Sequence, residues 1–447
     1  MSGPTEAHYI HPDQLRIGLY IHLDLSWMDH PFSFSSFKIR NDGQIAQIRA
    51  LKLARIRYSP ERSDAEPAPA LVPTVSTIVE AEAVGDTDAV PSADQRAVAP
   101  VGEDPAIQAK RDRAARLRAR RDLFARCERD FMRVTHTVKL VAQNVINKPE
   151  WAKEETTVLV GSLVDKLLAD GDMAVNLMAD RIGGEDVYVH SLNVAVLSLM
   201  LAREQGMARD ELVSLGLGAF FHDIGKLDVP PKVLLKQEPL THAENLLLRE
   251  HVVFGSKIGA RIGLTPDVLA VVAQHHEHVD GSGYPRGATG ERITLLAKIV
   301  AIANTYDNLC NPANPQRAMT PHEALALMYA QYRNRFEAAP LNTFIRCLGV
   351  YPPGTIVVLN NDAFGLVVSV NSSRPLKPDV LVYDAAIPKD DAIILSLEQE
   401  PEIQIARTLR PGQLPKTIFD YLSPRKRVAY FFDTPRPAAS EPAAAST

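Results

Sequence analysis

The chain is poor in cysteine and has no long apolar run. Its 447 residues include only 3 cysteines, widely separated and without a CxxC pair, which excludes a disulfide framework and a thiolate zinc site. No apolar stretch reaches the roughly 18 residues that a membrane-spanning helix needs, and the N-terminus lacks the basic-then-apolar pattern of a signal peptide. We therefore expect a cytoplasmic protein without a membrane span.

The chain also lacks an excess of basic charge. Lysine and arginine number 49 against 54 acidic residues, a formal net charge of -5, which argues against a general nucleic-acid-binding protein. Residues 110–133 are rich in arginine, but acidic residues are interleaved, and leucine and phenylalanine supply an apolar stripe. This segment therefore predicts a packed or coiled helix with a solvated face rather than a nucleic-acid patch.

Composition and periodicity predict a mainly α protein with small β-containing parts at both ends. A hydrophobic content of 46% and a charged content of 23% are ordinary for a globular protein, and the length allows two or three domains. Proline, alanine and acidic residues without periodicity indicate disorder. The predicted segments are a small β-containing domain at 1–60, a disordered acidic linker at 61–109, a helical domain at 110–349, a small β appendage at 350–433 and a disordered tail at 434–447.

Alternating apolar residues and turn residues predict the strands of the two β-containing parts. In the first part, a strand is expected at 17–21 and a turn at 41–43. In the second part, strands are expected at 355–359, 365–370, 380–383, 393–397 and 403–406.

The most unusual stretch is HHEHVDGSGYPRG, at residues 275–287. Its first half offers two adjacent histidines as metal ligands. Its second half cannot continue a helix, because Gly281, Gly283 and Pro285 break it. Metal-binding side chains beside a rigid, glycine-rich loop predict a catalytic site in which the histidines hold the metal and the loop shapes the substrate site.

The remaining ligands are sought in the helical region, because 8 of the 13 histidines fall between residues 190 and 322. Asp186 and His190 are four residues apart, so they share one face of a helix. His222 and Asp223 end an apolar helical run that would bury them, and a divalent cation compensates a buried His-Asp pair directly. Lys226 would face the same cleft, where an anionic substrate could bridge it to the metal.

One set of side chains is the candidate ligand shell: His190, His222, Asp223, His251, His275 and His276. A lone buried histidine is usually a hydrogen-bonded core residue, and Asp186 alone could equally be a helix-start acid. His242, His278 and His322 are assigned to the surface. Six ligands exceed one tetrahedral site, so we expect two ions with Asp223 between them. Histidine and carboxylate without thiolate favour Fe, Mn, Co, Ni or Zn over Mg or Ca.

His190 followed by FFHDIGK, His251 and HHEHVDGSGYP resembles the HD-GYP subgroup of HD-superfamily phosphohydrolases, over about residues 181–321. The N-terminal LRIGLYIHLD and SWMDHPF resemble a domain of unknown function often found ahead of HD-GYP domains. The resemblance implies an all-α HD-type catalytic domain that uses two or three divalent ions, Fe or Mn first, to hydrolyse the bacterial second messenger cyclic di-GMP to pGpG and sometimes GMP.

The same resemblance implies roles for individual residues. The six candidate ligands match the metal ligands of the family. Lys226 matches a lysine that contacts phosphate, and Gly283, Tyr284 and Pro285 form the loop beside the substrate. His222, Asp223 and Lys226 are therefore the expected catalytic residues. The acidic ligand ahead of His190 is Glu185 or Asp186, and Asp186 has the better helical spacing.

Two positions depart from the family pattern. Asn304 stands where the family has a ligating aspartate; an amide oxygen ligates without charge, so the nearest metal should bind more weakly or differ in identity. Asp307 is expected to contact a guanine base or a neighbouring side chain, or to replace the missing ligand. Residues 311–318 replace a basic segment of the family, which leaves Arg317 to meet phosphate.

Three functions remain open. The first is a metal-dependent phosphodiesterase in which metal-activated hydroxide attacks phosphorus while the ions and Lys226 offset charge on the phosphate oxygens. The second, motivated by Asn304 and residues 311–318, is a weakly active or inactive cyclic di-GMP receptor. The third is a phosphohydrolase of other nucleotides, such as dNTPs or the stringent-response alarmone. The helical region is a candidate homodimer surface, and the Gly-Tyr-Pro loop a candidate docking site for signalling proteins.

Overall fold

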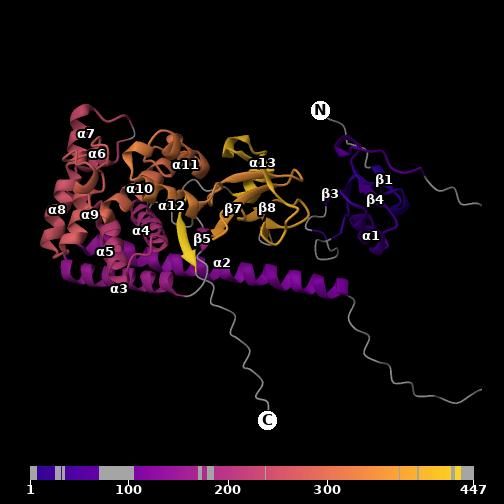
Figure 1. Ribbon diagram of the computed structural model, residues 1–447, viewed down its shortest axis with the longest axis horizontal. Helices are drawn as coiled ribbons and strands as arrows, with labels where there is room; N and C mark the ends of the chain where they lie inside the picture. Colours follow the sequence, from indigo (N-terminus) through magenta and orange to yellow (C-terminus); the bar gives the residue numbers. More distant parts are fainter. Residues whose placement is uncertain are drawn as a thin grey trace, which may run out of the picture. The chain divides into compact units, whose positions relative to one another are not determined.

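The protein is described by a computed structural model in which the chain divides into two compact units, residues 1–118 and 119–447 (Figure 1). Most of the predicted linker and all of the predicted tail lie outside the residues that the structure describes, as does Glu185. The described residues are 8–25, 32, 36–69, 105–169, 174–178, 186–236, 238–371, 373–389, 392–423 and 428–433.

The first unit holds a four-stranded antiparallel sheet around its own apolar core. Asn41 does not belong to a turn as expected: its side chain accepts a hydrogen bond from the Gln44 backbone and caps helix α1 (Asp42–Ala50), because asparagine serves helix starts as well as turns. Contacts of this unit continue past residue 60, since Ala68 and Gln14 are hydrogen bonded. In spatial order the strands are β1 (His8–Ile10), β4 (Ile56–Tyr58), β2 (Tyr20–His22) and β3 (Ser36–Lys38).

The expected charged helix is longer than residues 110–133 and forms α2 (Pro105–Asn144). In the second unit, α4 (Asp186–Glu204) is the central helix, and every side chain from 192 to 202 is buried. Within the described residues, no helix combines the length and hydropathy needed to cross a membrane. The helices packed with α4 include α3 (Pro149–Leu168), α5 (Arg209–Phe221), α10 (Leu295–Cys310) and α12 (Ala338–Leu348).

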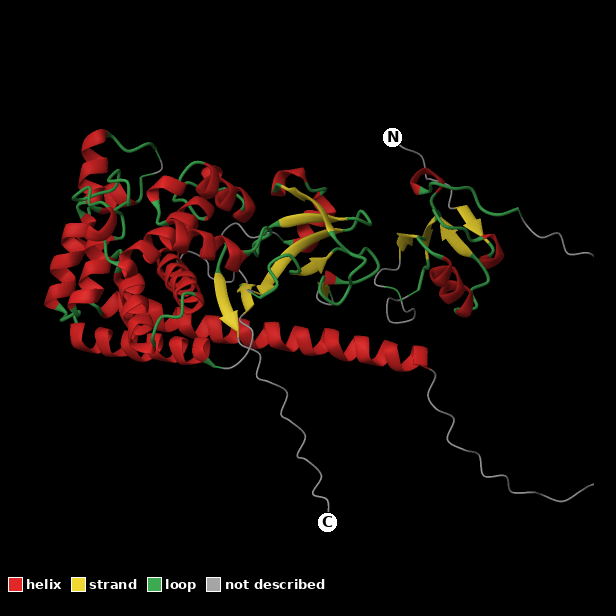
Figure 2. Cartoon of the chain, viewed as in Figure 1, coloured by secondary structure: helices red, strands yellow, loops and turns green. Residues whose placement is uncertain are grey.

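The remaining described helices of the second unit are shorter than α3 and α4 (Figure 2). A 3-10 turn, η4 (Ile224–Asp228), follows α5 and packs against α8. These remaining helices are α6 (Pro231–Leu234), α7 (His242–Arg249), α8 (His251–Arg261), α9 (Pro266–Gln274), α11 (Pro321–Ala330) and α13 (Lys416–Leu422).

The second unit also carries a seven-stranded sheet, so the mainly α class with small sheets at both ends is confirmed. Four of its strands lie where the sequence predicts them, to within a residue at each end: β6 (Ile356–Leu359), β7 (Phe364–Asn371), β8 (Asp379–Val382) and β9 (Ile393–Ser396). The fifth, β10 (Ile405–Leu409), begins and ends later than the predicted strand at 403–406.

Two strands of this sheet were not expected. β5 (Ala174–Leu177) comes from within the helical region, and β11 (Tyr430–Asp433) comes from the end of the described chain. β5 pairs with β7 on one side and with β11 on the other. The sheet is therefore joined to the helices through β5 and β11 rather than being a separate appendage.

Candidate metal centre

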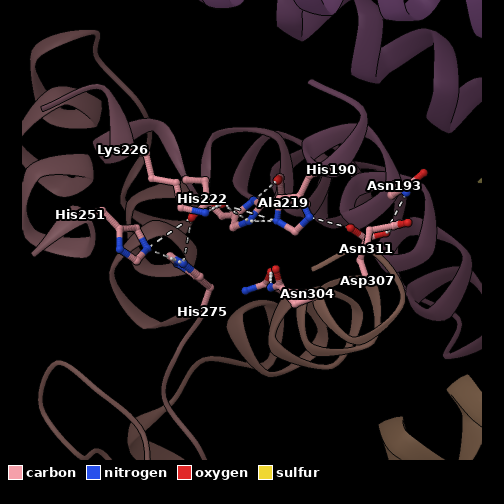
Figure 3. Close-up of polar contacts among 12 residues, drawn as sticks. His190, Asn193, Ala219, His222, Lys226, His251, His275, Asn304, Asp307 and Asn311 are labelled. Atoms are coloured by element: carbon pink, nitrogen blue, oxygen red, sulfur yellow. Dashed lines mark hydrogen bonds and ion pairs between the residues drawn. The ribbon is translucent and has the colours of Figure 1, made fainter. Parts of the chain in front are cut away.

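The predicted ligands converge from four places in the fold (Figure 3). His190 lies on α4, His222 and Asp223 follow the end of α5, His251 begins α8, and the histidine pair follows α9. Donor atoms within each of two groups lie within 4.8 Å of one another. The groups are His190, His222 and Asp223, and then Asp223, His251, His275 and His276.

The ring orientation of three histidines is set by their own backbone. Nδ1 of His222, His251 and His275 lies 2.6–2.9 Å from the carbonyl oxygen three residues earlier. A carbonyl only accepts, so each Nδ1 carries the proton and each Nε2 presents a lone pair. The hydrogen bond of one ring nitrogen fixes the tautomer that leaves the other nitrogen free for a metal.

The lone pairs face each other. Nε2 of His251 lies 3.3 Å from Nε2 of His275, and with both protons at Nδ1 these atoms cannot hydrogen bond to one another. Oδ1 of Asp223 lies 3.3 Å from the His251 Nε2 and 3.8 Å from the His275 Nε2. It is buried and has no hydrogen-bond partner among the described residues. Two facing lone pairs and an unpartnered carboxylate oxygen are stabilised by a cation between them, so the residues fit a divalent metal.

The second group is completed by the other oxygen of the same carboxylate. Oδ2 of Asp223 lies 3.4 Å from the His222 Nε2 and 3.5 Å from the His190 Nε2, and Lys226 Nζ donates to it at 2.5 Å. One oxygen thus faces each group, as a carboxylate shared by two ions would. Burial alone would raise the pKa of Asp223, but Lys226 and His222 hold it well below its usual range.

The charge state of the imidazoles suits ligation. Burial lowers the pKa of His222, and it lowers those of His275 and His276 strongly, so these rings are neutral at neutral pH. Burial would also lower the pKa of His190, but hydrogen bonds to Asp223 and Asp307 raise it to about 9. A cation bound at His190 must therefore displace a proton from Nε2.

Asp307 lies against the Nδ1 side of the His190 ring. Its carboxylate is fully buried and accepts hydrogen bonds from His190 Nδ1 at 2.6 Å and from the amides of Asn193 and Asn311. Of the three expectations for Asp307, contact with a neighbouring side chain is the one that the structure contains. The sequence could not distinguish these three expectations, because His190 on α4 and Asp307 on α10 are 117 residues apart in the chain.

The other predicted residues are placed less completely. Asn304 on α10 is buried beside the space that the histidines line (Figure 3), and its Oδ1 accepts a hydrogen bond from Asn308 at 2.7 Å. Arg317 is exposed in a 3-10 turn. Asp186 begins α4, and its side chain lies outside the described part of the structure.

The Gly-Tyr-Pro loop folds back onto the histidine pair. The Tyr284 ring stacks on His276 with centroids 4.5 Å apart, and its backbone N–H donates to the His276 carbonyl. A Cβ at Gly283 would lie 2.4 Å from the His278 nitrogen, so only glycine permits this approach. Burial raises the pKa of Tyr284 further above neutrality, which keeps the phenol uncharged. Pro285 is exposed.

Two residues that the sequence analysis missed support this loop. The buried carboxylate of Glu277 accepts the backbone N–H groups of Arg286 and Ala288 at 2.8 and 2.9 Å, which ties the loop to the end of the ligand segment. The guanidinium of Arg249 lies 4.7 Å from the centroid of the Tyr284 ring. The sequence did contain a signal for each residue. Glu277 is an acid between the histidine pair and the loop, and Arg249 is an arginine two residues before His251.

Comparisons with known proteins find matches to both parts of the chain. A model of the HD domain matches residues 162–339, and a model of a domain of unknown function, DUF3391, matches residues 8–156. The cyclic di-GMP phosphodiesterase PA4108 of Pseudomonas aeruginosa is 26% identical over 384 residues, 83% of this chain and 84% of that protein.

Two further relatives match over the helical region. The cyclic di-GMP phosphodiesterase response regulator RpfG of Xanthomonas campestris pv. campestris is 32% identical over 168 residues, 37% of this chain and 44% of that protein. The 3'3'-cGAMP-specific phosphodiesterase 3 of Vibrio cholerae is 34% identical over 140 residues, 31% of this chain and 30% of that protein. The chain thus spans less than half the length of these two relatives.

Proposed function

We propose that this chain, an HD-domain protein with an N-terminal DUF3391 domain, is a metal-dependent phosphodiesterase that hydrolyses cyclic di-GMP to pGpG, with GMP as the alternative end product. The observation that carries the proposal is the pair of ligand groups sharing Asp223, with Lys226 alongside. Such a cluster suits phosphodiester hydrolysis. A relative named for this activity aligns along 83% of the chain.

The ligand chemistry supports two ions, with Fe or Mn first and Zn, Co or Ni as alternatives, because histidine and carboxylate are present without thiolate. Asp186 and Asn304 are proposed as further ligands of the metal nearest them, and a third ion is the alternative to two. When bound, the ions supply Lewis acidity and a water of lowered pKa.

The protein's own side chains position the phosphate and hold protons. The Lys226 ammonium, one third exposed beside Asp223, can turn from that carboxylate to a non-bridging phosphate oxygen and offset its developing charge. His222 and Asp223 orient the reacting groups from a buried position. Arg249 places a second cation against the Tyr284 ring, where it would bind a phosphate or the edge of a base. Arg317 remains a proposed phosphate contact.

A second candidate, a receptor that binds cyclic di-GMP with little hydrolysis, is favoured by one observation. The Oδ1 of Asn304, the atom that would ligate a metal, already accepts a hydrogen bond from Asn308. A weakened site at this position predicts fewer than two bound ions, whereas the enzyme predicts at least two. Metal content of protein purified without oxygen therefore separates the two candidates.

The direct test is hydrolysis of cyclic di-GMP by purified protein loaded with Mn(II) or Fe(II), with product identified as pGpG or GMP. Activity should require metal and should fall by at least about 100-fold in His251→Ala, since one ligand group is broken. Absence of product from protein that holds two ions would refute the proposal. Parallel reactions with 3'3'-cGAMP and dNTPs test the alternative substrates.

Two partner proposals accompany the function. Exposed apolar side chains on α2, among them Met132 and Leu140, support a homodimer through the helical region. The exposed Pro285 and Arg286 of the Gly-Tyr-Pro loop support docking of signalling proteins there. We propose no nucleic-acid partner, in keeping with the net charge of -5.

A further inference from the structure

Two asparagines beside the metal centre make the same set of contacts. The amide nitrogens of Asn193 and Asn311 each donate to Oδ1 of Asp307 and to the carbonyl oxygen of Val428, at 2.7–2.8 Å. Their amide oxygens accept backbone N–H groups from the same segment, Asn311 from Val428 at 2.7 Å and Asn193 from Tyr430 at 2.9 Å. All four amide hydrogens and both amide oxygens are used, which fixes the orientation of each amide.

These contacts lead directly to a predicted ligand. Oδ1 of Asp307 accepts the two amides, and Oδ2 accepts His190 Nδ1 at 2.6 Å. The acceptor behind a ligating histidine sets the ring's orientation and basicity. The amides of Asn193 and Asn311 therefore hold the group that holds His190.

The amides in turn depend on residues 428–433. Without Val428 and Tyr430, each amide would lose two of its three contacts and could rotate away from Asp307. The segment is held by the sheet, because β11 pairs with β5, and by the hydroxyl of Tyr306, 3.0 Å from that of Tyr430. A shift of the sheet relative to α4 and α10 would therefore change the position of the Asp307 carboxylate.

We propose that residues 428–433 are a structural part of the metal centre: through the Asn193 and Asn311 amides they position Asp307 and hence His190. Asn193 and Asn311 are positioning residues, and the C-terminal sheet sets the affinity of the metal at the His190, His222 and Asp223 group. This inference rests on the metal-binding half of the proposed function and not on the substrate.

The test is metal binding by the full chain in which Asn311 is changed to alanine. Asn311 is only partly buried, so the variant should fold, and its thermal unfolding checks this. Mn(II) titration should show one site weakened by about 10- to 100-fold and the other unchanged. The visible spectrum of bound Co(II) should change for the weakened site alone. Asn193→Ala should give the same pattern; should it fail to fold, Asn311→Ala decides.

The matched control is Asn176→Ala. Asn176, like Asn193, is a buried amide and lies on β5 opposite Phe431 of β11, but it donates to Cys127 and not to Asp307. It should leave both metal affinities as in the unaltered chain. Unchanged affinities in Asn311→Ala, or an equal loss in Asn176→Ala, would overturn the inference. If the unaltered chain binds two ions but leaves cyclic di-GMP intact, the proposed substrate is wrong while the Asn311 result still decides this proposal.

Discussion

Replacing Gly225 by alanine should separate the two halves of the metal centre. Gly225 lies in η4, which follows the proposed ligands His222 and Asp223, and η4 packs against α8, which begins with His251. A Cβ at Gly225 would lie 1.8 Å from the His251 carbonyl oxygen and 2.3 Å from the Gly255 nitrogen. Both are backbone atoms, so neither can rotate away.

The size of the effect follows from these distances. Ordinary Cβ contacts begin at 3.4 Å, so the gap must open by 3.4 − 1.8 = 1.6 Å. The His251 Nε2 and Asp223 Oδ1 atoms are 3.3 Å apart. If the whole 1.6 Å displacement separated these two atoms, their distance would grow to about 5 Å. Two donors on one ion with bonds of about 2.1 Å cannot be more than about 4.2 Å apart. Shared coordination would therefore be lost.

Gly225→Ala should lower Mn(II) affinity and cyclic di-GMP hydrolysis by about 100-fold or more, since a misplacement of about 1 Å already costs that much in rate. Overpacking should also destabilise the fold by about 1–3 kcal/mol. Isothermal titration with Mn(II), thermal unfolding and product analysis would measure the three effects.

Gly161 in α3 is the matched control, because a Cβ there meets no atom within 4 Å. Gly161→Ala should keep full metal binding and stabilise the helix by up to about 1 kcal/mol. Two Mn(II) ions bound by Gly225→Ala with the affinity of the unaltered chain would refute this reasoning.

Three further outcomes are expected. Glu277→Gln removes the anionic acceptor of two loop N–H groups, and each hydrogen bond to a charged partner contributes about 1.5–3 kcal/mol. The KM for cyclic di-GMP should therefore rise while the Mn(II) affinity stays the same. An unchanged KM would contradict the role of Glu277. Lys226→Met should lower kcat/KM by about 10²–10³-fold. The control Lys236→Met breaks an ion pair with Glu244 outside the ligand set and should leave kcat/KM unaltered. If both variants lowered kcat/KM equally in kinetic assays, the result would argue against a phosphate contact of Lys226. Chelation should lower the melting temperature, because metal at 100 times its Kd stabilises the folded chain by about 2.7 kcal/mol; identical melting curves with EDTA and with Mn(II) would count against a resident metal.

The sequence alone determined which chemistry is present. Imidazole and carboxylate ligands are recognised by residue type, and the apolar run before His222 shows that the pair is buried. Glycines and a proline after His276 show where the helix must end. These are local properties, readable from a few neighbouring residues, and together with the resemblance they predict the ligand set and the mainly helical catalytic region. The five predicted strands between residues 355 and 406 follow from local alternation in the same way.

Only the tertiary structure decided how these groups meet. Asp307 contacts His190 across 117 residues, and Asn193 contacts Val428 across 235, and no periodicity in the chain encodes such pairings. β5 was missed because a four-residue strand inside a helical region has no signal apart from its partners. The facing Nε2 atoms and the backbone contact that requires Gly225 likewise arise only when separate helices pack. Local patterns specify element type and ligand chemistry, whereas long-range packing sets orientation, and the metal centre depends on orientation.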